Sequence, residues 1–354
     1  MSVPDAPARG LGEALVTLRR ARGLTQAELA ERAGVTQAAL SRYESELRYP
    51  DNNHVRALAG ALGVTHDFLR RPGRVRGAMA VDAHMRRRAT AKATVWRQLE
   101  AQLNTYRMHA LQLSEEVHVG AAQAIPRFDP FEIPPVDAAR MVRMQWQLPI
   151  GPVRDLVRWL EAAGCLVIMN DFGTGRVDGM SQWTDDVPIM LVNQRTPTDR
   201  LRLTLAHELG HLCLHSVDIS DDVESDANAF AAEFLMPSET IAPQLRNLTV
   251  GRLHDLKREW GVSMQALIEK AHALGHLSAT RRTSFYKTFS ANGWRTREPG
   301  SDQLTPEVSQ LPAQIARSVL DRGLSPDELA RIAGFASDRD NTLFRPASPR
   351  LHAV

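Results

Sequence analysis

The stretch LTLAHELGHLCLH, residues 203–215, restricts the possible fold of this chain more than any other feature. His207 and His211 are four residues apart, so on a helix they lie on one face, a single turn apart, and can bind the same ion. Glu208 follows the first histidine and can reach a water molecule beside that ion as a general base. The apolar residues around these three predict a helix, and a predicted strand precedes it. We therefore expect a metal site with His207 and His211 as ligands.

This HExxH spacing is typical of zinc metallopeptidases, whose tetrahedral site has three protein ligands and a water. His215 continues the spacing, but on a straight helix it lies about 12 Å along the axis from His207 and is rotated by about 80°. One ion cannot bind both, so we place His215 at the helix end or beside a ligand. The next helix, VESDANAFAAEFLMP, offers Glu224, with Asn228 one turn later to orient a ligand imidazole. Asp226 points about 200° away from Glu224, and we therefore choose Glu224 as the third ligand.

The residues around the HExxH helix predict an α+β region. CLVIMN (165–170) and VPIMLVN (187–193) are apolar runs with β-branched residues and flank a Gly- and Asp-containing segment, GTGRVDG. The strand at 187–193 is either a core strand or an edge strand that aligns an extended substrate by backbone pairing. Glu233 is expected at a structural position beside the LMP turn. Helical spacing covers residues 136–148, 150–163, 198–214 and 223–235.

Residues 10–70 predict five short helices separated by glycines. Thr25 and Glu28 form a capping box that starts the second helix. Gly34 then permits a tight turn, and Thr36 can cap a third helix, QAALSRYE. This succession of short helices predicts a helix-turn-helix.

The polar face of the second and third helices could bind a double-stranded DNA operator. Gln26 can donate to a phosphate, and the first turn of the third helix presents Gln37, Ala38 and Ser41 to base edges. A glutamine can read adenine with two hydrogen bonds and the Ala38 methyl can contact thymine, while Arg42 can meet a phosphate or a base. The alternative is a helix-turn-helix used only for dimerisation or protein contact.

Charge is distributed unevenly, although the net charge is only +2. Residues 1–100 hold 17 Lys and Arg against 10 Asp and Glu, whereas the remainder holds 26 against 31. A polyanion would therefore meet the N-terminal end. The sequence has no apolar run of membrane-spanning length and no signal peptide. Cys165 and Cys213 suit a reducing compartment, so we expect a cytoplasmic protein without membrane contact.

The remaining segments carry less information. Residues 70–88 are basic and are interpreted as a solvated linker or a phosphate-contacting arm, and helical spacing follows at 93–113. A Pro-rich segment at 124–135 marks a boundary. Near the C-terminus, Trp294 in NGWRTREPG is expected to pack rather than react, and a helical pair covers 306–334. No internal repeat is apparent.

Two segments of the chain each resemble a known family. Residues 11–70 resemble the XRE, or Cro/CI-like, helix-turn-helix domain, although relatives often have Gly where Glu46 or Leu47 stands, so the turn after the third helix is expected to be longer. About residues 130–290 strongly resemble the ImmA/IrrE metallopeptidases, several of which cut a partner repressor of the XRE type. The resemblance implies a multi-domain protein, in which an all-α, lambda-repressor-like helix-turn-helix domain precedes an α+β, gluzincin-like zincin domain and a small helical C-terminal region. The expected domains are 10–70 (helix-turn-helix), 71–135 (basic, helical connector), 136–282 (metallopeptidase), 283–340 (helical) and 341–354 (flexible tail).

Carried over onto this chain, the metallopeptidase resemblance implies Zn²⁺ as cofactor, His207, His211 and Glu224 as its ligands, and Glu208 as catalytic base. Many relatives have Glu at the position of Asp226, a conservative change. The function expected is a DNA-binding regulator, a homodimer on two half-sites, whose peptidase cleaves a partner regulatory protein in a stress, phage or mobile-element response. Two alternatives have no proteolysis: a transcription factor whose peptidase fold serves sensing or dimerisation, and the antitoxin-type regulator of a two-gene system.

Overall fold

The computed structural model describes residues 10–70, 93–117, 120–184, 187–216, 220 and 222–346. These residues form two compact units. The first, here called the terminal unit, takes in the described residues of 1–120, 184–189 and 310–354. The second, the central unit, takes in those of 121–183 and 190–309. The chain therefore leaves the terminal unit, builds the central unit and then returns.

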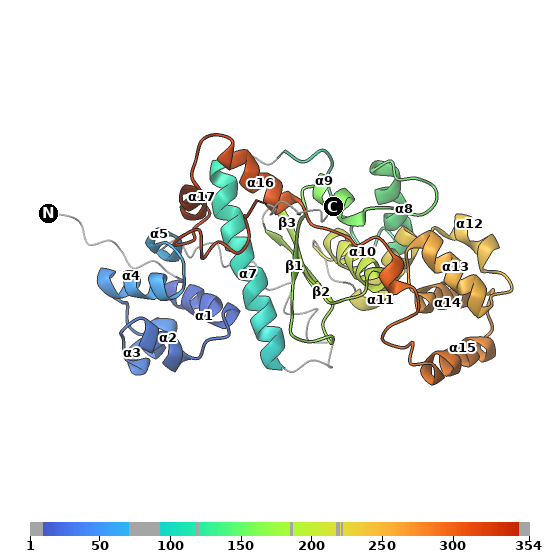
Figure 1. Ribbon diagram of the computed structural model, residues 1–354, viewed down its shortest axis with the longest axis horizontal. Coiled ribbons are helices and arrows are strands. Elements are labelled where there is room, and N and C mark those ends of the chain that lie inside the picture. Colours follow the sequence, from blue (N-terminus) through green and yellow to red (C-terminus); the bar gives the residue numbers. More distant parts are fainter. Residues whose placement is uncertain are drawn as a thin grey trace, which may run out of the picture. The chain divides into compact units, whose positions relative to one another are not determined.

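The N-terminal part of the terminal unit consists of five short helices, as the sequence predicts (Figure 1). The capping box is confirmed, because the Thr25 hydroxyl accepts from the Glu28 amide and the Glu28 carboxylate accepts from the Thr25 amide. Thr36 likewise caps the third helix by accepting from the Ala39 amide. The helices are α1 (Leu11–Ala21), α2 (Gln26–Arg32), α3 (Gln37–Glu44), α4 (Asn52–Ala61) and α5 (His66–Arg70).

The turn after α3 is built around Glu46, one of the two positions, with Leu47, at which the sequence departs from the helix-turn-helix resemblance. Glu46 adopts a left-handed backbone conformation with φ 54°. Its carboxylate accepts from the amides of Gly10 and Gly12, at 2.8 and 3.2 Å, and so caps the start of α1. A Cβ at Gly12 would lie 2.5 Å from the Glu44 carbonyl oxygen, so this close approach needs a glycine. Glu46 thus joins the turn after α3 to the start of α1.

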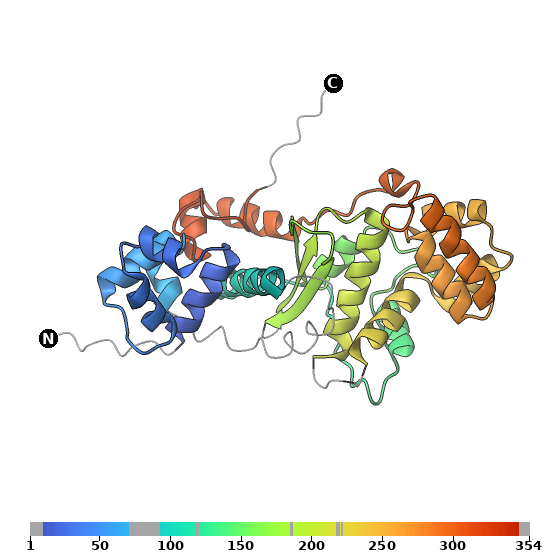
Figure 2. The ribbon, with the colours of Figure 1, turned by 90° about the horizontal axis from the view of Figure 1, so that it is seen from below.

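Three more helices complete the terminal unit: α7 (Ala93–Glu116), α16 (Leu311–Leu320) and α17 (Pro326–Ile332). Helix α7 packs against α1 and α17, and Figures 1 and 2 show it alongside α1. Most of the basic 70–88 stretch lies outside the described residues. The flexible tail was expected from residue 341, but Asn341 and Phe344 are buried, and the Asn341 side chain bonds to the Phe344 backbone. Residues 347–354 lie outside the described part of the chain.

His109 of α7 is buried at the centre of an aromatic stack. Its ring lies between Phe68 and Phe335, with ring centroids 4.3 and 3.7 Å away. Its Nδ1 lies 2.7 Å from the Ala333 carbonyl oxygen, which can only accept, so Nδ1 carries the proton. Burial, helped by the charge of Arg22 and opposed by the Ala333 bond, lowers the pKa of His109 to about 3. His109 is therefore neutral in the folded protein.

This neutral histidine predicts acid sensitivity. The folded-state pKa of His109 lies below its ordinary value of 6.5. As the pH falls below 6.5, His109 therefore becomes protonated in the unfolded chain but not in the folded chain, which favours unfolding. Its contribution to stability is complete above pH 6.5, and about 1–2 kcal/mol is expected to be lost by about pH 5. Hydrogen exchange of the α7 amides at about pH 7 and about pH 5, corrected for the intrinsic rate, measures this loss of stability. A His109→Gln variant should lack this pH dependence; equal pH dependence in both proteins would contradict it.

The central unit contains most of a three-stranded sheet, formed by β1 (Leu166–Asn170), β2 (Gly179–Thr184) and β3 (Val187–Asn193) in the order β1-β3-β2. The predicted strands β1 and β3 are confirmed, and β2 was not foreseen. Of the two alternatives for 187–193, the core strand is confirmed and the substrate-aligning edge strand is wrong. Because β2 pairs with β3, β3 lies in the centre, and five of its residues from Ile189 onward are buried.

Helix α10 (Thr198–Leu214) lies beside this sheet (Figures 1 and 2). The helix expected at 150–163 begins only at Leu156, because Pro152 disfavours helical backbone at Gly151 and Asp155 is left-handed with φ 49°. Trp294 packs against the core, as expected. None of the helices in the described part of the chain has the length and apolar character needed to span a membrane. The helices of this unit are α8 (Pro135–Gln145), α9 (Leu156–Ala162), α10 (Thr198–Leu214), α11 (Val223–Leu235), α12 (Ser238–Ile241), α13 (Val250–Trp260), α14 (Met264–Ala273) and α15 (Ala279–Ala291).

Candidate metal centre

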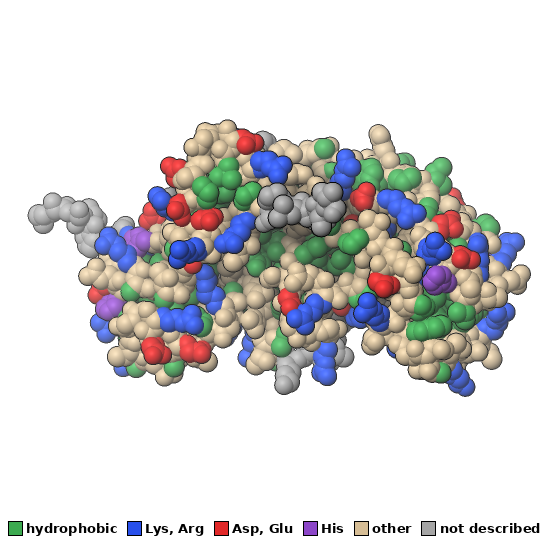
Figure 3. Space-filling view, viewed as in Figure 1, with side chains coloured by type: hydrophobic (Ala, Val, Ile, Leu, Met, Phe, Trp, Pro, Cys, Tyr) green, Lys and Arg blue, Asp and Glu red, His purple; other side chains and the backbone are tan. Residues whose placement is uncertain are grey.

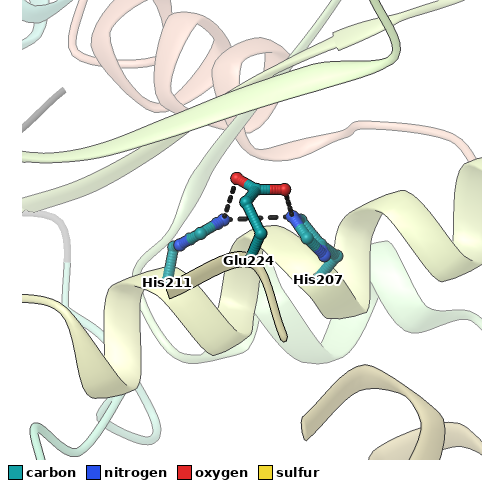
Figure 4. A group of neighbouring side chains, drawn as sticks. All are labelled: His207, His211 and Glu224. Carbon is teal, nitrogen blue, oxygen red and sulfur yellow. Dashed lines mark hydrogen bonds and ion pairs between the residues drawn. The ribbon is translucent and has the colours of Figure 1, made fainter. Parts of the chain in front are cut away.

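Three side chains from α10 and α11 converge on one point (Figure 4). His207 and His211 lie on one face of α10, and their Nε2 atoms are 3.0 Å apart. The carboxylate of Glu224, in the first turn of α11, reaches between them. Its two oxygens lie 3.6 Å from Nε2 of His207 and 3.5 Å from Nε2 of His211. The structure thus brings together the three residues that the sequence suggested as ligands.

The spacing of these atoms suits a small cation. Ligand atoms held tetrahedrally at about 2.0–2.2 Å from zinc lie about 3.3–3.6 Å apart. The separations here, 3.0, 3.5 and 3.6 Å, are close to that range. Two imidazole nitrogens and one carboxylate oxygen also match the ligand types of catalytic zinc sites, which leave a fourth position for water. In the described part of the chain, this is the one group of three His, Cys, Asp or Glu side chains arranged to hold a metal ion.

Neighbouring side chains orient both imidazoles. Nδ1 of His207 lies 3.0 Å from the Asn228 amide oxygen, which can only accept, so Nδ1 is protonated and Nε2 is the atom that could bind a metal. Nδ1 of His211 lies 3.0 Å from Nδ1 of His215. His215 therefore contacts a proposed ligand from the side opposite the metal position, consistent with the helical geometry. Such outer partners set the tautomer and the orientation of ligand histidines.

A glycine within HELGH allows α10 and α11 to pack this closely. A Cβ on Gly210 would lie 3.2 Å from the Cα of Ala227 and 3.2 Å from the Phe230 side chain. Asp222 caps α11 by accepting from the Ser225 amide, which fixes where that helix begins. Glu224 is then held in the first helical turn, where the helix dipole favours a negative charge. Gly210, the fourth residue of the HExxH stretch, thus has a packing role.

Glu208 is almost fully buried next to the ligand group, and β2 holds its carboxylate. The Ser181 hydroxyl of β2 lies 2.8 Å from Oε2 of Glu208 and donates to it. Trp183 of the same strand donates to the Leu212 carbonyl of α10 at 2.8 Å. At Gly179 a Cβ would lie 2.8 Å from Thr204, so β2 starts directly against α10. Sequence reasoning missed Ser181, because GMSQWT lacks the alternation of apolar and polar residues that would have predicted a strand.

The other acidic residues of α11 lie away from the three ligand atoms. Asp226 accepts from the Ser220 hydroxyl, and its carboxylate lies 3.8 Å from Nε2 of His215. Glu233 lies 3.0 Å from Arg140 and 2.7 Å from Lys270, and it accepts from Ser238 just after the LMP turn. Burial alone would raise the pKa of Glu233, but the bonds from Lys270 and Ser238 outweigh it and hold the pKa below its usual value. Glu233 is thus structural, as expected.

The proposed DNA-contacting residues lie on α2 and α3. Gln37, Ala38 and Arg42 are exposed, and Ser41 is half-buried. The Gln26 amide donates to the Glu44 carboxylate at 2.8 Å, so in this conformation it is held within the domain. Figure 3 shows basic and acidic side chains interspersed over the visible face of α1–α5. A polar reading face is therefore present on α3, without a uniformly basic surface on the side shown.

Two family models match the chain. A model described as helix-turn-helix matches residues 15–69, which include α2, α3 and α4. A peptidase M78 model, described as an IrrE N-terminal-like domain, matches residues 160–277, which include all three strands with α10 and α11. No curated protein matches the chain. The expected order, helix-turn-helix first and an α+β domain of metallopeptidase type second, is confirmed.

Proposed function

Because the chain joins an XRE-type helix-turn-helix domain to an IrrE N-terminal-like domain of the M78 peptidase family, we propose that it is a DNA-binding transcriptional regulator with a zinc-dependent endopeptidase. The peptidase cuts a partner regulatory protein, such as a repressor, in a stress, phage or mobile-element response. One observation carries the proposal: His207, His211 and Glu224 converge beside the buried carboxylate of Glu208. The helix-turn-helix binds a DNA operator, as a homodimer on two half-sites.

Each residue of the site has a defined role in this proposal. His207, His211 and Glu224 hold the metal. A bound zinc ion would supply Lewis-acid polarisation of the scissile carbonyl and would acidify water. Glu208 accepts a proton from the attacking water and later passes it to the leaving amine. Ser181 keeps the Glu208 carboxylate in place by donating to Oε2 at 2.8 Å.

The presence of a base favours a peptidase over a purely sensing or dimerising domain. A structural zinc site is closed by four protein ligands and needs no base. Here three ligands meet, and the adjacent carboxylate is buried with its own hydrogen-bond donor. Burying a charged carboxylate lowers the stability of the fold, and a site that only held a metal would not need one. The site is therefore better explained by hydrolysis than by metal-dependent folding alone.

Co-expression tests the choice of substrate. The chain, as wild type or as Glu208→Gln, is produced with each protein encoded by a neighbouring gene, and fragments are identified by mass spectrometry. A partner cut by the wild type and left whole with the variant supports the proposal. If no partner is cut differently by the two proteins under any stress-mimicking condition, the sensing or antitoxin-type alternative is favoured.

The DNA-reading role predicts a loss of affinity for Gln37→Ala and Ser41→Ala. Each base contact is worth about 1–3 kcal/mol, so operator affinity should fall roughly 5- to 150-fold and selectivity should relax. Fluorescence anisotropy with the DNA upstream of the chain's own gene, at one fixed salt concentration, measures this. Gln303→Ala, an exposed glutamine of the central unit, is the matched control. Unchanged affinity and selectivity in both α3 variants would exclude α3 as the reading helix.

A further inference from the structure

One C-terminal helix, with the turns on either side, repeats the sequence of an N-terminal one. RGLSPDELARIAGF, residues 322–335, aligns without a gap with RGLTQAELAERAGV, residues 22–35, and eight of the fourteen positions are identical. The aligned stretches comprise α17 and α2 with the turns on either side. The expectation that the chain has no internal repeat is therefore wrong. A single short copy, 300 residues away, leaves no periodic signal.

The two copies also share their local structure. Ser325 and Glu328 form the same reciprocal capping box at the start of α17 as Thr25 and Glu28 form at the start of α2. The turn that follows is closed in the same way, since the Phe335 amide donates to Ala330 at 2.8 Å and its counterpart donates at 2.9 Å. Left-handed backbone recurs at the matching glycines Gly23 and Gly34, then Gly323 and Gly334.

The C-terminal copy ends where the DNA-reading helix would begin. Thr36, which caps α3, is replaced by Ala336, whose methyl group cannot accept the capping hydrogen bond. A turn follows instead, in which the Asp340 amide and carboxylate both bond to Ser337. Gln26, the proposed phosphate donor, is matched by Pro326. The copy therefore keeps the scaffold of the motif and lacks the residues for contacting DNA.

The turn of the copy is docked on the first helix-turn-helix domain. Residues 334–336 pair with the α4–α5 turn: the Thr65 amide donates to the Gly334 carbonyl at 2.9 Å, and the Ala336 amide donates to the Gly63 carbonyl at 3.1 Å. Val64 and Phe335 form an isolated antiparallel bridge between these two bonds. A Cβ on Gly334 would lie 2.2 Å from the Phe68 ring, so the fit requires glycine there.

Side-chain packing extends this contact into the core. Phe335 is 2% exposed and stacks on His109 of α7, which stacks in turn on Phe68 of α5. Phe68 belongs to the same hydrophobic core as Leu40 of α3. Loss of the Phe335 contact would loosen α5 and α7, and with them the core that supports α3. Figure 1 shows α17 next to α5 and α7.

We propose that residues 311–346 are a docking element whose partner is the helix-turn-helix domain of the same chain, and that operator binding requires it. The DNA-binding module is then discontinuous in the sequence, formed by segments that precede and follow the central unit. The helix-turn-helix family model, at residues 15–69, covers only its first part. This inference rests on the proposed DNA-binding function and adds the intramolecular partner.

The test uses Phe335→Ala in the full-length, zinc-supplied chain. Removing a fully packed aromatic side chain should weaken operator binding at least about tenfold and speed hydrogen exchange in α5 and α7. Zinc content should stay unchanged, because the metal ligands belong to the central unit. Phe335→Leu, a milder change, should give an intermediate affinity. Val308→Ala, at a 45% exposed apolar residue of the central unit, is the matched control and should match the wild type.

The outcomes separate the two proposals. A wild type that binds its operator and a Phe335→Ala variant that binds equally well, with unchanged exchange in α5, would overturn the docking inference and leave the DNA-binding proposal intact. A wild type that binds no DNA would remove the proposed DNA binding and this inference with it. If Phe335→Ala does not accumulate, operator affinity and hydrogen exchange in α5 and α7 are measured on Phe335→Leu instead, and wild-type values for both would overturn the docking inference.

Discussion

Replacing Glu208 by Gln is expected to slow cleavage of the partner protein by at least about 100-fold, the lower range of what a positioned general base contributes. The amide cannot accept the proton of the attacking water. It has nearly the same size as the carboxylate, and its oxygen can still accept from the Ser181 hydroxyl that now lies 2.8 Å from Oε2. The side chain should therefore stay in place, and the loss should be in catalysis and not in folding.

Cleavage rates and zinc content, measured on the same preparation, check this prediction. Glu208→Gln should keep one zinc per chain, because Glu208 is not among the three converging ligands. Glu239→Gln, an exposed glutamate at the start of α12, makes the same chemical change away from the site and should cleave at the wild-type rate. Wild-type cleavage by Glu208→Gln would show that another group is the base.

Loss of a metal ligand should have a similarly large effect, on affinity. His211→Ala and Glu224→Ala are each expected to weaken zinc binding by more than the roughly 10- to 100-fold that loss of an outer partner costs. Asn228→Ala removes only the oxygen that lies 3.0 Å from Nδ1 of His207, so it should fall within that smaller range. Competition with a chelator of known affinity measures all three.

The same titration decides between the two carboxylates of α11. Glu224 lies 3.5 and 3.6 Å from the two ligand nitrogens, whereas Asp226 is engaged by Ser220. Asp226→Ala should therefore keep zinc affinity close to that of the wild type. The assignment fails if Asp226→Ala releases zinc and Glu224→Ala retains it.

Local features of this chain are readable from its sequence. The position of His211 relative to His207 follows from helix geometry alone, and the choice of Glu224 over Asp226 follows from which face of one helix each occupies. The helix-turn-helix is also marked locally, by the capping box at Thr25 and the turn at Gly34. In these places the decisive interactions are only three or four residues apart.

Features set by distant contacts could not be read in this way. Strand β2 is short and mixes polar with apolar residues, so its pairing with β3 and the contact of Ser181 with Glu208 depend on the assembled sheet. The order of the strands likewise decides which are edges, and a sequence alone does not show it. The docking of Phe335 on His109 joins residues more than 200 positions apart.

Stepwise return of zinc to the chelated wild-type protein tests the central claim most directly. Cleavage of the partner should be absent without metal, should rise in proportion to added zinc and should level off at one zinc per chain, as a single group of His207, His211 and Glu224 requires. Full cleavage by the metal-free protein, or no cleavage with one zinc bound, would contradict the account.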